Sequence, residues 1–79
     1  MLIRTQNKTC LTLLENIDCI CIEETATHKY RVKAQYNDGS LYLGTYGTWD
    51  ACKEVLENIY YCYGNKCICY QMPEVIEDE

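Results

Sequence analysis

Three positively charged side chains occupy every second position near the middle of this chain. Lys29, Arg31 and Lys33 alternate with Tyr, Val and Ala, and a second alternating stretch holds Tyr42 and Tyr46. Guanidinium groups pair well with phosphate, and tyrosine rings stack on bases. These residue types predict a surface that binds an anionic ligand containing a ring. The alternative is an ordinary solvated sheet face, on which Lys and Arg stems lie along aromatic rings.

Two strands are needed to bring these side chains together. Residues 29–36 and 41–46 both alternate polar with apolar side chains, and the Asp-Gly pair at 38–39 lies between them. Such a pair readily forms a two-residue hairpin turn with positive φ. With 38–39 as the loop, Arg31 faces Tyr46 across the hairpin, and the charged and aromatic residues share the face opposite the core.

The remaining pattern predicts an α+β fold. Thr48 is a suitable N-cap for an amphipathic helix at about 49–63, in which apolar residues recur every three or four positions. Further short strands are expected at 2–4, 10–14, 19–23 and 66–72. The expected architecture is an antiparallel meander of about five to six strands, with the helix packed on one face. The other face stays open to water, a ligand or a second copy.

Length and charge indicate a single small domain with an acidic end. The chain has 79 residues and a formal charge of −5, and four of its 12 acidic residues lie within 74–79. Residues 1–73 are predicted to form the domain, and 74–79 a disordered acidic tail. Because the domain is nearly neutral, it is not expected to imitate or bind duplex DNA. No apolar run has the length of a membrane span, and no export signal is seen, so a cytoplasmic location is expected.

The seven cysteines and the single histidine do not form a recognisable catalytic or metal motif. In a reducing cytosol the cysteines are expected to be reduced and mostly buried. The two Cys-Ile-Cys stretches, at 19–21 and 67–69, do not suit zinc, because alternate side chains of a strand lie too far apart for one tetrahedral ion. His28 has no Cys beside it in the sequence. We therefore expect no enzyme activity, no catalytic residue, no metal and no cofactor.

A second cationic segment precedes the expected second strand. The turn Arg4-Thr5-Gln6-Asn7-Lys8 carries two positive charges. It could hold a phosphate or a partner, with Arg4 added to the hairpin residues as a ligand contact. A turn without a binding role is the alternative.

The order of these features resembles that of small, mostly uncharacterised proteins of Gram-positive bacteria and their phages and mobile elements. The resemblance covers nearly the whole chain. It rests on an Arg-Ser-Gln-Asp-Lys-like turn (here 4–8, with Thr and Asn for Ser and Asp), a Leu-Gly-x-Tyr hairpin end (43–46), a Lys-x-Val-Leu-x-x-Ile helix (53–59) and a Met-Pro-acid end (72–74). It implies a similar fold and a phage or prophage origin. Some small phage proteins counter bacterial defence by sequestering a nucleotide signal in an oligomer.

The leading hypothesis is therefore a non-enzymatic, homo-oligomeric viral accessory protein of the bacterial host cytoplasm. It would act as a sponge for a nucleotide second messenger. The site would comprise Arg4, Lys29, Arg31, Lys33, Tyr42 and Tyr46. The alternative hypothesis is a protein-binding inhibitor that blocks a host defence enzyme or nuclease through its sheet face or edge. A purely structural or regulatory accessory role is a third interpretation.

Overall fold

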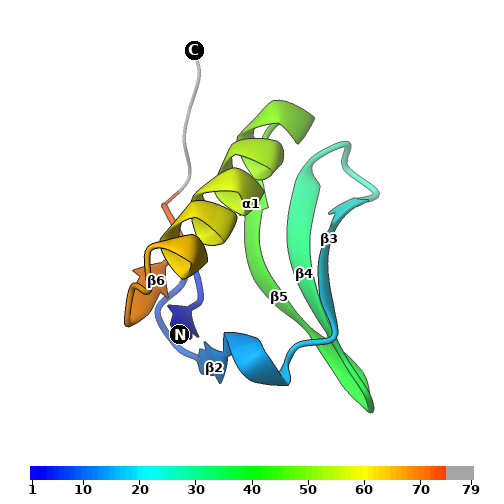
Figure 1. Ribbon diagram of the computed structural model, residues 1–79. Coiled ribbons are helices and arrows are strands. Elements are labelled where there is room, and N and C mark those ends of the chain that lie inside the picture. The colour runs from blue at the N-terminus through cyan, green and yellow to red at the C-terminus, as the bar shows by residue number, and fades with distance from the viewer. Residues whose placement is uncertain (75–79) are drawn as a thin grey trace.

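The computed structural model describes residues 1–74, and its architecture is α+β (Figure 1). In chain order the elements are β1 (Leu2–Arg4), β2 (Leu11–Leu13), the 3-10 turn η1 (Leu14–Asn16), β3 (Cys19–Glu24), β4 (Tyr30–Tyr36), β5 (Gly39–Tyr46), α1 (Trp49–Gly64) and β6 (Cys69–Gln71). All the expected strands and the helix are present. Apart from Glu74, the predicted acidic tail lies outside the described residues.

The strands form two three-stranded sheets, so the prediction of a continuous antiparallel meander is wrong. One sheet has the order β3-β4-β5 and is antiparallel throughout. The other has the order β2-β1-β6, and β6 runs parallel to β1. Two connections explain the difference. The η1 turn leads the chain from the second sheet into β3, and α1 leads it from β5 back to the second sheet, where β6 lies parallel to β1.

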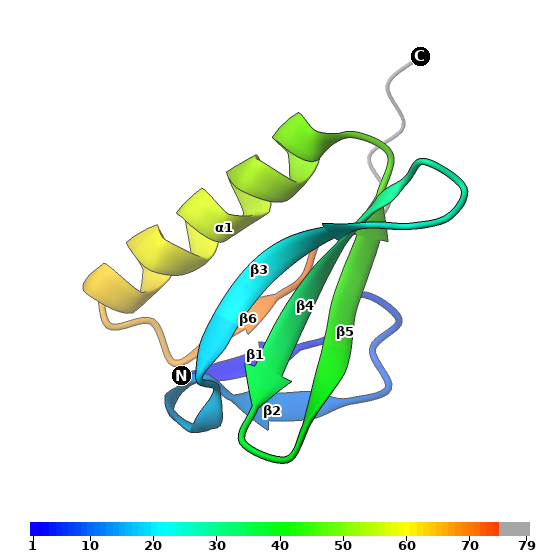
Figure 2. The same ribbon diagram turned by 90° about the vertical axis from the view of Figure 1, so that its right-hand side faces the viewer.

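Figure 2 shows the short strands of the second sheet gathered near the end of β3-β4-β5 where the β4–β5 turn lies. Helix α1 extends along one face of the longer sheet (Figure 1). The other face of that sheet carries no helix within residues 1–74. The prediction of one helix on one sheet face is confirmed.

The β4–β5 hairpin has a different register from the predicted one. Its loop is the pair 37–38 rather than 38–39, because Tyr36 pairs with Gly39. No glycine in the described chain has a positive φ, so the Asp-Gly pair does not form the expected turn. A bulge then shifts the register between Val32 and Lys33: Lys33 pairs with Tyr42, whereas Val32 pairs with residue 44. One extra residue of β5 is thereby inserted.

The core lies between α1 and the inner face of β3-β4-β5. Nine hydrophobic residues are buried: Ile3, Val32, Ala34, Leu43, Tyr46, Cys52, Val55, Ile59 and Met72. Ile3 and Met72 bring the second sheet and the segment after it into the same core. The oxygen of the Thr48 side chain accepts a hydrogen bond from the Ala51 backbone N–H at 3.1 Å. This bond confirms the predicted N-cap, which fixes where the helix begins.

Trp49, the first residue of α1, packs edge-on against Tyr30 of β4. The two ring centroids are 6.0 Å apart, and the rings are inclined by 81°. This edge-to-face arrangement is the one that aromatic quadrupoles favour. Trp49 therefore anchors the start of the helix against the sheet, and its side chain remains half-exposed.

Candidate functional site

The outer face of β3-β4-β5 carries the polar half of each alternating strand. Successive side chains of a strand point to opposite sides, so one face takes every second residue. Val32 and Ala34 are buried on the inner side, which leaves Arg31 and Lys33 on the outer side. The pairing of β3 with β4 places Glu23 opposite Arg31.

Four side chains on this face form what we call the basic-aromatic cluster: Glu23, Arg31, Lys33 and Tyr42. The Arg31 guanidinium carbon lies 3.9 Å from the centre of the Tyr42 ring, a cation–π contact. A guanidinium nitrogen of Arg31 is 3.7 Å from one Glu23 carboxylate oxygen, and the Lys33 ammonium is 3.8 Å from the other. The sheet register thus brings two cations, one carboxylate and one aromatic ring together.

The cluster has an excess of positive charge and incomplete hydrogen bonding. Two cations share the single Glu23 carboxylate, at distances longer than a strong charged hydrogen bond. Arg31 Nε and one Glu23 oxygen are shielded from solvent and have no hydrogen-bond partner within residues 1–74. The side chains of Arg31 and Lys33 remain 31% and 21% exposed. An incoming anion could therefore reach both cations and compete with Glu23.

Tyr46 was predicted to lie on this face, and that placement is wrong. The residue is only 1% exposed and belongs to the hydrophobic core. Its hydroxyl donates a hydrogen bond of 2.8 Å to the backbone oxygen of Pro73. The β-bulge is the cause, because one extra residue in β5 turns every later side chain of the strand to the opposite face. Burial raises the pKa of Tyr46 well above its ordinary value, so the phenol stays neutral.

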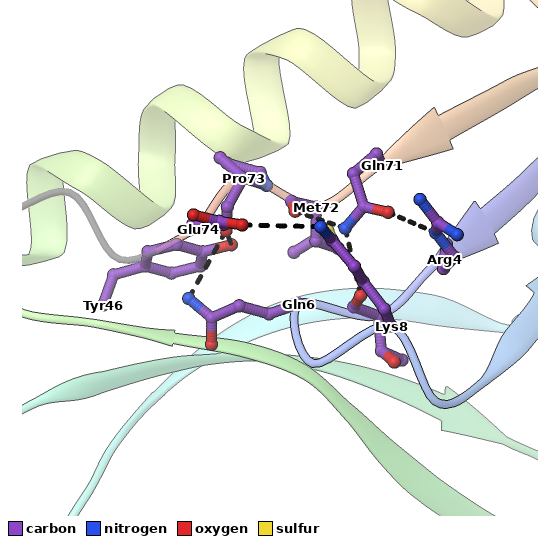
Figure 3. Close-up of polar contacts among 9 residues, drawn as sticks. Arg4, Gln6, Lys8, Tyr46, Gln71, Met72, Pro73 and Glu74 are labelled. Atoms are coloured by element: carbon purple, nitrogen blue, oxygen red, sulfur yellow. Dashed lines mark hydrogen bonds and ion pairs between the residues drawn. The ribbon is translucent and has the colours of Figure 1, made fainter.

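Lys29 and Arg4 lie outside the cluster. Lys29 is exposed in the loop that precedes β4, where its backbone N–H donates to the Thr25 hydroxyl at 3.1 Å. Arg4 belongs to β1 in the other sheet, and its Nε donates to the Gln71 side-chain oxygen (Figure 3). The predicted six-residue site is therefore not assembled as a unit: Arg31, Lys33 and Tyr42 are brought together.

The polar turn at residues 4–8 is held by contacts within the protein. Lys8 lies 3.5 Å from the Glu74 carboxylate, and the Gln6 side-chain nitrogen donates to the backbone oxygen of Pro73 at 3.4 Å (Figure 3). The same nitrogen donates to the backbone oxygen of Thr45 at 3.0 Å. The Gln6 side-chain oxygen also accepts from the Thr45 backbone N–H at 2.9 Å. The Gln6 side chain thus pairs with the edge of β5 much as a neighbouring strand would.

A small hollow lies between this turn and β5. It has a volume of about 160 Å³ and is lined by residues 5–7 of the turn and 42–45 of the strand. Tyr42 belongs to both the hollow and the basic-aromatic cluster. The turn and the hairpin, two separate features of the sequence, therefore meet at Tyr42.

The sequence interpretation missed the contacts of two residues, Glu23 and Gln6. The signal for Glu23 was its position near the end of an alternating β3, but its place opposite Arg31 depends on the register of β3 with β4. Gln6 offered no comparable signal, because its partners are 39 and 67 residues away in the chain.

The cysteines are free, but the prediction that most are buried is wrong. Cys52 is buried, two others are half-buried, and the remaining four are exposed. Burial raises the pKa of the Cys52 thiol. Within residues 1–74, no three His, Cys, Asp or Glu side chains form a group suited to a metal ion. The described part of the chain also has no helix long and apolar enough to cross a membrane.

No protein-family model, curated protein or solved structure matches this chain. Its fold and site define it as a small α+β protein with an open sheet face that carries a basic-aromatic cluster.

Proposed function

We propose that the protein binds a small anionic ligand of nucleotide type on the outer face of β3-β4-β5, without catalysing its conversion. The observation that carries the proposal is the Arg31 guanidinium at 3.9 Å from the Tyr42 ring centre, with Lys33 in the same cluster. Cations beside an accessible aromatic ring suit a ligand that combines phosphate with a base. Tyr42 is 44% exposed, so a ligand ring can stack on it.

Binding would exchange one set of ionic contacts for another. The ligand phosphate would pair with Arg31 and Lys33 in place of the Glu23 carboxylate, which now pairs with both. Partly exposed ion pairs at distances of 3.7 and 3.8 Å contribute only about 0–1 kcal/mol each, so releasing Glu23 costs little. The ligand ring would stack on Tyr42, and the hollow beside Tyr42 would take a neighbouring group. Because the face is open, two copies of the chain facing one another would enclose the ligand best.

The wider role that we propose is that of a phage or prophage accessory protein in the host cytoplasm. A homo-oligomer that holds a nucleotide second messenger without cleaving it would counter bacterial defence as a sponge. The resemblance in motif order supports this role, and the basic-aromatic cluster supplies the binding chemistry.

Isothermal titration calorimetry with a panel of cyclic and linear nucleotides tests the proposal. We expect at least one nucleotide to bind and Arg31→Ala to abolish binding, with an unchanged circular dichroism spectrum. Lys53→Ala is the matched control, because it removes one positive charge from an exposed position on α1. If no nucleotide binds, or if Arg31→Ala leaves affinity unchanged, the assignment is wrong.

A second candidate function is inhibition of a host defence enzyme or nuclease through a sheet edge. Within residues 1–74, β3 pairs with β4 alone, so its other edge can accept a strand from a partner. Deletion of residues 74–79 separates the two functions. It should weaken contact with a basic protein and leave nucleotide binding intact.

A further inference from the structure

An apolar groove lies on the helix side of the molecule, across the sheet from the basic-aromatic cluster. It is bounded by the second half of α1 on one side and by η1 and the start of β3 on the other, and its volume is about 570 Å³. Its apolar walls are formed by Leu14, Ile17, Ile20, Leu56, Tyr60 and Tyr63. This volume lies within the range of about 300–1,000 Å³ typical of ligand sites.

The helix side of the groove presents two accessible aromatic rings. Leu56, Tyr60 and Tyr63 follow one another at spacings of four and three residues, so they share one stripe of α1. Tyr60 is 79% exposed and Tyr63 is 53% exposed. Exposed apolar surface of this kind marks an interaction site, and tyrosine is among the residues enriched in binding hot spots.

The rim of the groove is acidic. Glu15 and Asp18 both line it. The amino group of Met1 bonds both Glu15 carboxylate oxygens, at 3.0 and 2.8 Å, and this hydrogen bonding holds the pKa of Glu15 below its ordinary value. Among residues 1–74, no cation pairs with the Asp18 carboxylate. The groove therefore offers apolar walls together with a free negative charge.

We propose that this groove docks a segment of a partner protein that carries apolar side chains next to Lys or Arg. Charge complementarity favours a basic partner, because Asp18 lacks a cation within the described chain. A second copy is a poorer occupant of this groove, because a symmetric contact would bring the Asp18 carboxylates of two copies together. An amphipathic helix laid into an open groove is the recognition mode that fits this shape.

A synthetic probe of defined chemistry tests the proposal. The probe is a fluorescein-labelled amphipathic helical peptide built from Leu and Lys, and its control has Glu in place of every Lys. We expect the Leu–Lys peptide to bind by fluorescence anisotropy and the Leu–Glu peptide not to bind. Amide chemical-shift changes in the labelled protein should concentrate in residues 14–20 and 56–63.

Matched variants separate groove binding from general attraction to an acidic protein. Tyr60→Ala combined with Tyr63→Ala should weaken binding at least tenfold, whereas Tyr61→Ala, at an exposed tyrosine outside the groove lining, should not. Asp18→Lys should also weaken it at least tenfold, more than the same change at Asp38 in the hairpin loop.

Several results would overturn the proposal. These are equal binding of both peptides, equal effects of the two Asp→Lys variants, or chemical-shift changes that avoid the groove. A dimer seen by sedimentation and disrupted by Tyr60→Ala would assign the groove to a second copy instead.

Discussion

The ring of Tyr46 lies directly over Gly44 in the core of the protein. A Cβ atom added at Gly44 would be 2.8 Å from the Tyr46 hydroxyl oxygen and 3.0 Å from a ring carbon. The ring cannot easily move away, because it is buried and its hydroxyl donates to Pro73. Because Gly44 has no side chain, the Tyr46 ring can occupy the space beside it. The bulge in β5 can then place Tyr46 on the core side of the sheet.

Gly44→Ala should therefore destabilise the protein by about 1–3 kcal/mol, the usual range for overpacking a core. Gly39→Ala is the matched control, because nothing lies within 4 Å of its Cβ position and its φ is not positive. That control should be neutral or stabilising by up to about 1 kcal/mol. Urea unfolding of both variants measures the difference. Equal stability of the two would show that Tyr46 relaxes freely.

Gln6→Ala should destabilise the protein by about 1–3 kcal/mol, because it removes three hydrogen bonds that tie the turn to Thr45 and Pro73. Gln6→Glu keeps an acceptor for the Thr45 N–H but loses both donated bonds, so it should also destabilise at neutral pH. Gln35→Ala is the control, because Gln35 makes one long bond of 3.4 Å to Gly39. Thermal unfolding should show a loss for both Gln6 variants and little change for the control.

Stability should fall as the pH rises from about 8.5 towards 11. Burial raises the pKa of the Cys52 thiol and of the Tyr46 and Tyr70 phenols in the folded protein. The unfolded chain releases these protons first, near pH 8.5 for Cys and 10 for Tyr. Between the unfolded and folded pKa values the folded state binds more protons, so the free energy of unfolding decreases with pH.

Urea unfolding at several pH values measures how the free energy of unfolding changes with pH. The Cys52→Ala variant shows how much of that change is due to the Cys52 thiol. The variant is less stable throughout, because the side chain it shortens is buried. Its loss of stability between about pH 8.5 and 10 should nevertheless be shallower than that of the original protein. An identical slope in both would rule out Cys52 as a contributor.

The sequence predicted the elements well where periodicity is strong. The helix from Trp49, its Thr48 cap and the two alternating strands around the hairpin are all observed. Each depends on residues near one another in the chain. The inner positions Val32 and Ala34 were also predicted, because alternation alone assigns them to the core.

The same local reasoning did not predict three features. These are the bulge in β5, the parallel pairing of β6 with β1, and the pairing of Glu23 with Arg31 and Lys33. The pairing of β6 with β1 joins residues 67 positions apart, and no local pattern encodes it. The hairpin register was wrong because an Asp-Gly pair was assumed to form a turn with positive φ. Gly44 was the local sign of the bulge, since an isolated glycine in a strand marks such a site. The position of Tyr46 followed from that one residue.

Glu23→Gln should strengthen anion binding at the basic-aromatic cluster. The carboxylate now lies 3.7 Å from Arg31 and 3.8 Å from Lys33, and it competes with any anionic ligand for both cations. Partly exposed pairs of this length contribute about 0.2–1 kcal/mol each, so removing both should raise affinity about two- to thirtyfold. Titration calorimetry with the nucleotide that binds best measures the change.

Glu24→Gln is the control for this prediction, because it makes the same charge change at the next residue of β3. Glu24 contacts His28 at 3.4 Å rather than the cluster, and neighbouring strand residues point to opposite faces. The affinity of the Glu24→Gln variant for the nucleotide should rise less than twofold. The gain in affinity from Glu23→Gln should become smaller at higher salt, because salt screens the charges of the cluster. If both variants gain affinity equally, the ligand responds to overall charge and not to the Arg31–Lys33–Tyr42 geometry. If Glu23→Gln weakens binding, the carboxylate holds the two cations in place for the ligand and does not compete with it.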